Sequence, residues 1–400
     1  MNVNTMRTVD RYAGIPLCWL AAIWRSLHRR QQEIHADKIR TILIIKFFGM
    51  GSIILTTPML TRLFERFPKA NVFYLSFAPN AELLRRLPFA LTPLAIRTDS
   101  IGHFVKDTFL ALKAIRQANV DIVFDLEFFS KFSTLISSLS GARHNVGYAL
   151  PTFWRERNLT HAVPLDRTGH VTAVFLHQLA IVGVLPARVP PLARLNCLET
   201  ETLSMQSKLG LSTNGVETYV VNINAGATAP ERRWPPGRFI EVTRYLHRQD
   251  PSARIFFIGA PEDYEYVSDA LAIAPDLQGA VANCAGLLSI GELIALLRRS
   301  RFLLTNDTGP MHLASAAGTR VIALFGPESP QFYGPRGEAR VLYKQIACSP
   351  CLNMYNAKLF VCPYNARCMR EITVDDVIGT LPPLKHQRRP MHAITTQSLH

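Results

Sequence analysis

The sequence lacks the features that mark secreted scaffolds, membrane-spanning proteins and the common nucleic-acid binders. Only seven of its 400 residues are cysteine, and this odd number in a long chain argues against a secreted disulfide framework and for a reducing cytoplasm. Helix-turn-helix, RNP and zinc-finger spacings are missing, so we expect no nucleic-acid partner despite the formal net charge of +14. Phosphorylated sugars, nucleotide diphosphates and anionic lipid headgroups account for such a charge equally well.

No apolar run near the amino terminus is long enough to cross a membrane. After Ile15-Pro16 the apolar residues share one helical stripe, but this apolar core covers about ten residues where about 20 are needed. Because no small-residue cleavage site follows, a secretory signal is the least favoured interpretation. Two others stay open for residues 12–30: an interfacial helix in peripheral contact with a membrane, or a helix packed on the protein's own surface. The first places a cytoplasmic protein at the inner face of the inner membrane.

Strand-like apolar runs alternate with helical segments along most of the chain, which predicts an α/β fold with two Rossmann-like, doubly wound domains. A hydrophobic content of 48% is enough for two buried cores. We divide the chain into an amphipathic extension, an N-terminal domain, a proline-rich linker, a C-terminal domain and a flexible tail. The predicted boundaries are, in that order, 1–37, 38–185, 186–217, 218–382 and 383–400.

One stretch combines a strand, a tight turn and a helix with polar residues at the turn. The apolar run Phe302-Leu303-Leu304 predicts a buried strand, and His312–Ala317 predicts a closely packed helix. The turn between them contains Asp307, Thr308 and Gly309, and in a βαβ unit such a turn lies at the carboxyl edge of the sheet. Free N–H groups and the positive helix end favour an anion such as phosphate there. Alternatively, Asp307 only caps the helix.

These residues also resemble a known family. Asp307-Thr308-Gly309 followed by His312 is similar to the D-[TS]-G-x-x-H signature of glycosyltransferase family 9, the heptosyltransferase-like enzymes. Residues 41–58 resemble the family's amino-terminal strand, loop and helix, and residues 224–239 resemble its donor loop, with a basic residue before Trp-Pro. The resemblance implies the GT-B architecture, in which two Rossmann-like domains face a central cleft. It also implies an acceptor site in the first domain and a nucleotide-sugar site in the second.

The resemblance also assigns the donor-binding residues. Arg232 stands where the family has a lysine that contacts the donor's diphosphate, and Glu262 stands near an acid that holds the ribose. The alternatives are that Arg232 and Arg233 form a solvent-facing pair, and that Glu262 or Asp263 caps a helix. The predicted donor site therefore consists of Arg232, Glu262, Asp307, Thr308, Gly309 and His312.

The general base is the weakest part of the resemblance. The family usually carries aspartate at the position of Ser52, and a serine hydroxyl does not accept a proton near neutral pH. Glu127 follows a predicted strand of the first domain and is a candidate to replace the missing base. Asp125 and Ser52 complete the predicted catalytic group. The alternative is that Asp125 or Glu127 pairs with Lys131 or Arg143, or caps the following helix.

The expected reaction needs no cofactor and no metal ion. The chain has no Asp-x-Asp metal motif, so we expect Arg232 and backbone N–H groups to stabilise the leaving diphosphate. By resemblance, the reaction inverts the anomeric centre of a nucleotide-diphosphate sugar such as ADP-heptose. The acceptor is then the lipopolysaccharide core or another bacterial surface glycan, bound as a glycolipid or saccharide.

Two other functions remain to be weighed. Ser52 favours a catalytically impaired homologue that binds nucleotide-sugars without turnover. Gly49-x-Gly51 after a strand favours an NAD-type oxidoreductase only weakly, because the third glycine of that fingerprint is absent.

Four cysteines near the end of the chain have a spacing that a metal ion can use. They follow the pattern C-x2-C-x10-C-x5-C, and four thiolates at such spacing can bind zinc tetrahedrally. Relatives carry cysteines in this region without a settled metal role, so we favour structural thiols and predict no metal ligands. The residues are Cys348, Cys351, Cys362 and Cys368.

Overall fold

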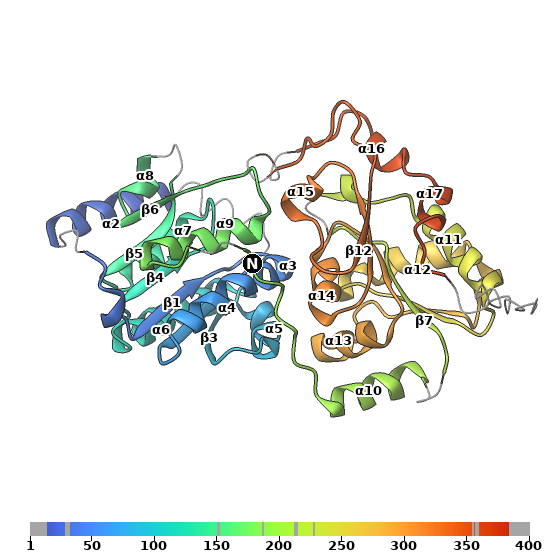
Figure 1. Cartoon of the computed structure of the whole chain (residues 1–400), viewed down its shortest axis with the longest axis horizontal. Helices are drawn as coiled ribbons and strands as arrows, with labels where there is room; N and C mark the ends of the chain where they lie inside the picture. The colour runs from blue at the N-terminus through green and yellow to red at the C-terminus, as the bar shows by residue number, and fades with distance from the viewer. Residues whose placement is uncertain are drawn as a thin grey trace, which may run out of the picture.

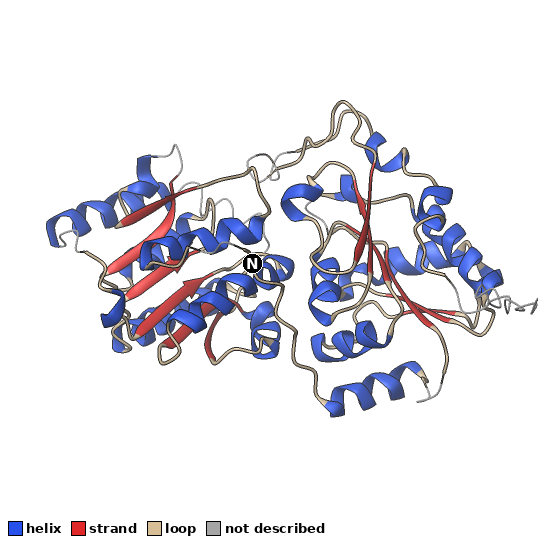
Figure 2. Cartoon of the chain, viewed as in Figure 1, coloured by secondary structure: helices blue, strands red, loops and turns tan. Residues whose placement is uncertain are grey.

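The computed structural model describes most of the chain and folds it into two α/β domains that lie side by side (Figure 1). The described residues are 14–28, 33–149, 153–185, 188–211, 215–226, 229–353, 356 and 360–383. Residues 1–13 and 29–32 of the predicted extension and all but the first residue of the predicted tail therefore lie outside the described residues. Each domain has a sheet at its centre with helices on both sides (Figure 2).

The N-terminal sheet has the strand order β3-β2-β1-β4-β5-β6, and all its neighbouring strands are parallel. Strands β1 and β4 are buried along their whole length, as expected for parallel strands covered on both faces. The chain leaves β1, moves outward to β2 and β3, and then returns to the other side of β1. The strands are β1 (Thr41–Ile45), β2 (Asn71–Phe77), β3 (Leu91–Ile96), β4 (Ile122–Asp125), β5 (His144–Ala149) and β6 (His161–Pro164).

The C-terminal sheet repeats this topology. Its order is β12-β11-β10-β7-β8-β9, again parallel throughout, so that β7 corresponds to β1 and β10 corresponds to β4. The fold class predicted from the sequence is confirmed by these two sheets. The strands are β7 (Thr218–Asn222), β8 (Arg254–Phe257), β9 (Val281–Asn283), β10 (Leu303–Asn306), β11 (Val321–Phe325) and β12 (Ala339–Tyr343).

Helices follow nearly every strand. In the N-terminal domain they are α2 (Gly14–His28), α3 (Met50–Leu55), α4 (Thr57–Arg66), α5 (Ala81–Arg86), α6 (Ile101–Gln117), α7 (Lys131–Leu139), α8 (Phe153–Glu156) and α9 (Val171–His177). In the C-terminal part they are α10 (Glu199–Leu209), α11 (Pro236–Gln249), α12 (Tyr264–Ala272), α13 (Ile290–Arg299), α14 (Gly309–Ala317), α15 (Pro330–Tyr333), α16 (Arg367–Arg370) and α17 (Val374–Ile378). The predicted linker thus contains the helix α10, which packs against α13.

The helices of the N-terminal domain form two layers. Side chains of α4 and α9 share a core cluster with Ile42 and Ile44 of β1, whereas side chains of α6 and α7 share another with Leu43 and Ile45. Helix α2 packs against α7 and α8, with Cys18 buried in the contact. No helix within the described residues has the length and apolar character needed to span a bilayer.

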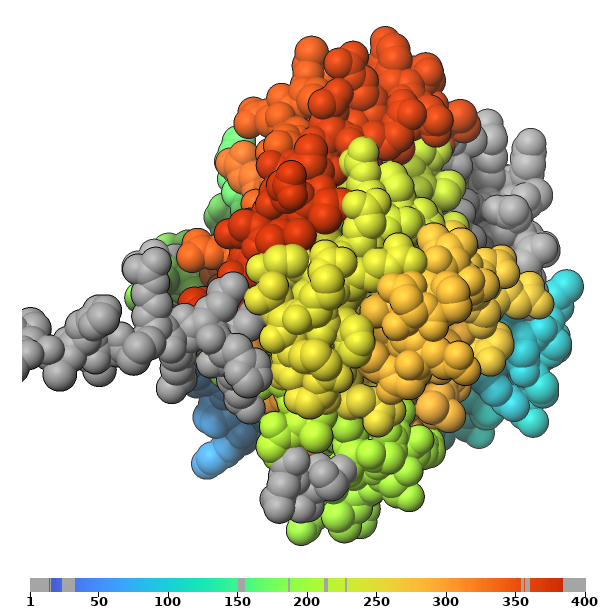
Figure 3. Space-filling view, turned by 90° about the vertical axis from the view of Figure 1, so that its right-hand side faces the viewer, coloured from blue at the N-terminus to red at the C-terminus, as the bar shows by residue number. Residues whose placement is uncertain are grey.

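The end of the described chain returns to the C-terminal domain and closes its core. The indole nitrogen of Trp234, which is fully buried, donates to the carbonyl of Ile372 at 2.9 Å, and Arg238 donates to the same carbonyl. Helix α17 accordingly lies against α11, as the red and yellow segments of Figure 3 show. This packing fixes the loop that carries Arg232, just before Trp234.

Candidate active site

The candidate site lies where the two domains touch, at the amino end of α14. Helices α3 and α14 face each other there (Figure 1). A methyl group added at Gly51 of α3 would stand 2.5 Å from Cδ2 of His312 and 3.3 Å from the Cα of Gly309. Because only glycine permits this approach, Gly51 and Gly309 bring the turn after β10 against the loop after β1.

The amino end of α14 is open to a ligand. Thr308 occupies the N-cap position, but its side chain makes no capping hydrogen bond. Its hydroxyl is held instead by the side-chain nitrogen of Asn222 on β7, at 2.9 Å. Pro310 has no N–H, and that of Met311 donates to the carbonyl of Thr308 at 3.1 Å, which among the described residues leaves the N–H groups of Thr308 and Gly309 for an anion.

Arg232 and Asp307 lie together at this helix end. Nη1 of Arg232 stands 3.3 Å from Oδ2 of Asp307, and Nη2 donates to the carbonyl of Ala225, also at 3.3 Å. Burial raises the pKa of Asp307, and the charge of Arg232 opposes that rise. Arg233 turns away and lies over the ring of Tyr266, 4.4 Å from its centroid. The two arginines therefore do not form a solvent-facing pair.

His312 is buried on α14, beside the domain contact. Burial lowers its pKa to about 3, with a smaller contribution from His170, so the imidazole is neutral at physiological pH. Among the described residues, its Nδ1 has no hydrogen-bond partner. A buried ring nitrogen without a partner is costly, which makes a bound ligand atom at this position favourable.

Glu262 is exposed at the loop after β8, and it does not cap the following helix. Oδ2 of Asp263 accepts the backbone N–H of Ala260 at 2.9 Å within the 3-10 turn Pro261–Asp263, and Asp263 makes no side-chain capping hydrogen bond to α12 either. The Glu262 side chain is exposed at the same sheet edge as Asp307.

Asp125 of β4 is sealed inside the N-terminal domain. Its Oδ2 accepts from Nη2 of Arg155 at 3.0 Å and from the hydroxyl of Ser133 at 2.8 Å, and neither side chain of the ion pair is exposed. Burial raises the pKa of Asp125 to about 6, although Arg155 opposes this shift. Asp125 thus pairs with Arg155 and not with Lys131 or Arg143, and it has no open path to a substrate.

Glu127 lies two residues further on and is held by the loop after β1. Its Oε1 accepts from Lys46 Nζ at 2.9 Å and from the backbone N–H groups of Phe47 and Phe48 at 2.7 and 3.0 Å. Within the described part of the chain, no donor contacts its other oxygen. Asp125 and Arg155 in turn bond the backbone N–H and carbonyl of Glu127, at 3.0 and 2.5 Å.

Ser52 is half-buried on α3, next to Gly51. It therefore lies at the domain contact, close to the amino end of α14. The loop between β1 and α3 thus brings Ser52 and the partners of Glu127 to the same edge of the N-terminal sheet.

Glu328 and Tyr333 belong to the site although sequence reasoning missed them. Glu328 follows β11. Burial and, to a smaller extent, the charge of Asp307 raise its pKa to about 8, while the N–H of Ser329 and the charges of Arg232 and Arg167 oppose this rise. Burial raises the pKa of Tyr333, and the charges of Glu328, Asp307 and Glu127, which come from both domains, add to this rise. The available signal was the position of Glu328, a few residues after β11 at the same sheet edge.

Two hydrogen bonds join the domains near this tyrosine. Nε2 of His170 lies 2.9 Å from the carbonyl of Gly334, and the side-chain amide of Gln331 donates to the carbonyl of Thr168 at 2.9 Å. The loop before α9 is thereby tied to α15, which positions Arg167 beside Glu328.

The four cysteines of the carboxyl-terminal region are free thiols. Among the residues that the structure describes, no three His, Cys, Asp or Glu side chains are grouped so that they could hold a metal ion. The segment that carries these cysteines holds the loop of Glu328 in place. The N–H groups of Cys351 and Leu352 donate to the carbonyl of Pro327, the residue before Glu328.

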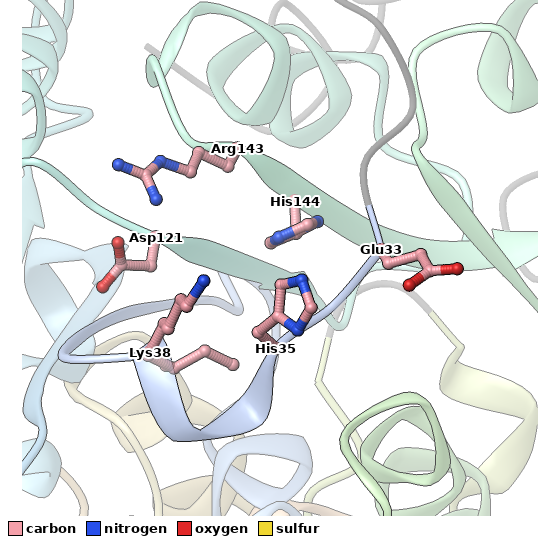
Figure 4. A pocket seen from close by; sticks show the side chains of 7 residues that line it. Glu33, His35, Lys38, Asp121, Arg143 and His144 are labelled. Carbon is pink, nitrogen blue, oxygen red and sulfur yellow. The ribbon is translucent and has the colours of Figure 1, made fainter.

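A separate cavity of about 140 Å³ lies at the amino ends of β1, β4 and β5 (Figure 4). Lys38, Asp121, Arg143 and His144 line it. These residues precede or begin their strands, whereas Glu127 follows β4, so Arg143 lies at the opposite end of the sheet from the candidate site.

Comparison with known proteins gives a consistent result. A family model described as glycosyltransferase family 9 (heptosyltransferase) matches residues 110–359. Lipopolysaccharide heptosyltransferase 2 of Escherichia coli (strain K12) is 31% identical over 115 residues, which cover 28% of this chain and 32% of that protein. Lipopolysaccharide heptosyltransferase 3 of the same strain is 24% identical over 291 residues, which cover 71% and 82%. The chain spans less than half the length of the curated relatives that it matches at 30% identity or more.

The fold has a close counterpart among solved structures. A glycosyltransferase family 9 structure from Veillonella parvula DSM 2008 superimposes with a TM-score of 0.71 and 23% identity, covering 88% of this chain and 97% of that one. The predicted GT-B architecture is thereby confirmed.

Proposed function

Because the chain belongs to glycosyltransferase family 9, we propose that it is an active glycosyltransferase. It moves heptose or a related sugar from a nucleotide-diphosphate sugar to the lipopolysaccharide core or another bacterial surface glycan. Relatives named lipopolysaccharide heptosyltransferase support the choice of sugar and acceptor. The observation that carries the proposal is the contact of Arg232 with Asp307, at the open amino end of α14.

The donor's diphosphate binds at this helix end without a divalent ion. Transfer breaks the bond from the anomeric carbon to the diphosphate, so negative charge grows on the leaving oxygens. The Arg232 guanidinium, the N–H groups of Thr308 and Gly309 and the positive helix end all favour that charge. Neutral His312 adds a hydrogen bond from its ring without contributing charge of its own. Glu262 binds the hydroxyls of the nucleotide ribose.

Glu127 is the general base of an inverting reaction. Its carboxylate takes the proton from the acceptor hydroxyl as that oxygen attacks the anomeric carbon, on the face opposite to the departing diphosphate. Lys46 and two backbone N–H groups fix Oε1 and leave Oε2 for the proton. Asp125 is a positioning residue, because with Arg155 it holds the backbone of Glu127. Ser52 orients the acceptor hydroxyl by a hydrogen bond.

The enzyme works in the cytoplasm, at the inner face of the inner membrane. Helix α2 supports this proposal, since Leu17, Leu20 and Ile23 are exposed on its outer side while its inner side packs on α7. The proposed partners are the nucleotide-sugar, the glycolipid or saccharide acceptor, and the membrane surface. No cofactor takes part.

A second candidate is a homologue that binds nucleotide-sugars but has lost catalysis. The observation that favours it is Ser52, which stands where the family usually has aspartate. Such a protein would bind the donor at Arg232 and Asp307 without releasing nucleotide.

Nucleotide release distinguishes the two candidates. Purified protein is incubated with ADP-heptose and, in parallel, with UDP- and GDP-sugars, with and without a deacylated core acceptor and with and without EDTA. We expect ADP release that requires the acceptor and is unchanged by the chelator. Binding without release would support the impaired homologue, and loss of release in EDTA would contradict the metal-independent mechanism.

A further inference from the structure

Helix α6 exposes an apolar stripe that the transfer reaction does not use. Ile101, Val105 and Phe109 are 65%, 60% and 67% exposed, and neighbouring Leu110 is 49% exposed. Residues four apart lie on one side of a helix, so the first three form a continuous row. Single exposed apolar residues are common, but a row of this kind on one helix marks a contact surface.

The charges beside this row are positive. Lys106 and Lys113 are exposed on the same helix. Its only acidic residue, Asp107, turns inward, where Arg97 donates to both carboxylate oxygens at 2.8 and 2.9 Å. Asp99 precedes the helix and lies 2.9 Å from the ring of His103, at the stripe's amino end. The outward face of α6 is therefore apolar and basic.

A second apolar face lies in the same helix layer. Helix α7 stands between α6 and α2: the rings of Phe104 and Phe132 are 4.9 Å apart, and α2 packs along α7. On α2, Leu20 and Ile23 are 63% and 52% exposed, while Cys18 is buried against α7. The segment Gly14–His28 contains no acidic residue.

We propose that the outer face of α6 binds an anionic lipid bilayer and acts together with the outer face of α2. The row from Ile101 to Phe109 enters the boundary between headgroups and acyl chains, and Lys106 and Lys113 contact lipid phosphates. An apolar stripe flanked by lysines, without exposed acids on the helix, is the pattern of interfacial helices. The contact extends the one proposed for α2 and is independent of sugar transfer.

A second copy of the chain fits this face less well. A two-fold interface pairs a surface with itself, which would bring Lys106 and Lys113 of one copy against the same lysines of the other. Like charges brought together in an interface oppose binding. Lipid phosphates instead neutralise both lysines, so the charges favour the bilayer.

Vesicle co-sedimentation of the full chain tests the proposal. We expect binding to vesicles of phosphatidylglycerol and phosphatidylcholine, and much weaker binding to phosphatidylcholine alone. The double variant Val105→Ser, Phe109→Ser and the double variant Lys106→Glu, Lys113→Glu should each lower the partition coefficient by about tenfold or more. A Leu20→Ser, Ile23→Ser variant measures the contribution of α2 to vesicle binding.

The matched control removes apolar surface elsewhere. Leu203 on α10 and Ile273 after α12 are 56% and 57% exposed, and changing both to serine should leave vesicle binding unchanged. Turnover of a soluble acceptor and the melting temperature of the Val105→Ser, Phe109→Ser variant show that the fold and the active site are intact. Unchanged vesicle binding by that variant would overturn the proposal. So would a wild-type dimer, seen by light scattering, that the variant dissociates.

Discussion

The two domains place an aspartate at the ends of equivalent strands, and each aspartate pairs with an arginine from a different part of its domain, with opposite consequences. Asp125 ends β4 and Asp307 directly follows β10, and these strands occupy the same place in their sheets. The pair of Asp125 with Arg155 is fully buried, at 3.0 Å. The pair of Asp307 with Arg232 is longer, at 3.3 Å, and the Arg232 side chain is 22% exposed.

The difference in burial suggests different roles for Arg155 and Arg232. Arg155 donates hydrogen bonds to the buried carboxylate of Asp125 and to the carbonyl of Glu127, so its charge is neutralised inside the domain and is not accessible to a ligand. Arg232 lies beside the amino end of α14, where N–H groups are also available, so its charge can serve a ligand. The two domains thus have an aspartate at equivalent strand ends. The degree of burial determines whether its arginine partner only stabilises the fold or remains accessible to a ligand.

The largest effect is expected at Glu127, which the sealed pair holds in place. Glu127→Gln keeps the size of the side chain and removes its basicity, so turnover should fall by about 10²–10⁴. Nucleotide release with saturating donor and acceptor measures this change. Adding Ser52→Asp to the variant should restore part of the activity, because the family usually has its acid there. Turnover close to that of the wild type would exclude Glu127 as the base.

Replacing Arg155 and Arg232 in turn tests how much each ion pair contributes to the free energy of unfolding. Arg155→Met leaves Asp125 buried without its partner and should lower the free energy of unfolding by about 3–5 kcal/mol. The matched Arg232→Met variant should lose less, because the contact with Asp307 is longer and the Arg232 side chain is 22% exposed. Denaturant unfolding at neutral pH measures both. Equal losses would break the comparison.

The Arg155→Met defect should also depend on pH. The folded-state pKa of Asp125 is raised to about 6, so the folded state favours the protonated carboxyl, and loss of Arg155 raises that pKa further. A protonated carboxyl carries no unpaired charge, and below about pH 6 both proteins hold Asp125 protonated. The defect should therefore shrink as pH falls from neutral toward 6 and stay level below it. A defect that stays constant or grows between neutral pH and pH 6 would contradict this account.

Arg232→Ala should slow the reaction without unfolding the protein. Loss of a charged donor to the leaving diphosphate is expected to lower kcat by about 10²–10³. Arg233→Ala is the matched control, since Arg233 lies over Tyr266 and does not reach Asp307. Similar losses in the two variants would remove the reason to assign the diphosphate to Arg232.

The smallest effect is expected at Glu328 and concerns pH. Its carboxyl is neutral below a pKa of about 8 and ionised above it, where its charge repels the donor's diphosphate beside Asp307. Affinity for ADP should thus fall above pH 8, by up to about tenfold per pH unit. Titration calorimetry of wild type and Glu328→Gln measures this, and the variant should lose the dependence. The same pH dependence in both proteins would assign it to another group.

The sequence alone determined the elements and the turn after β10. Continuous apolar runs such as Thr41–Ile45 and Phe302–Leu304 predicted parallel strands, because strands covered on both faces require apolar residues at every position. Local spacing sufficed for Asp307, Thr308, Gly309 and His312, since a turn and the helix that follows it are adjacent in the chain. The predicted extension gave a helix, α2, but its packing against α7 was only one of two interpretations.

Only the tertiary structure decided the partners. Lys46 with Glu127, Arg155 with Asp125, and the approach of Gly51 to His312 join residues from distant parts of the chain. Glu328 was missed for the same reason, because its raised pKa comes from burial and from Asp307, which follows the neighbouring strand β10. Periodicity records which face of an element is apolar, but burial and charge pairing depend on what the fold brings against that face.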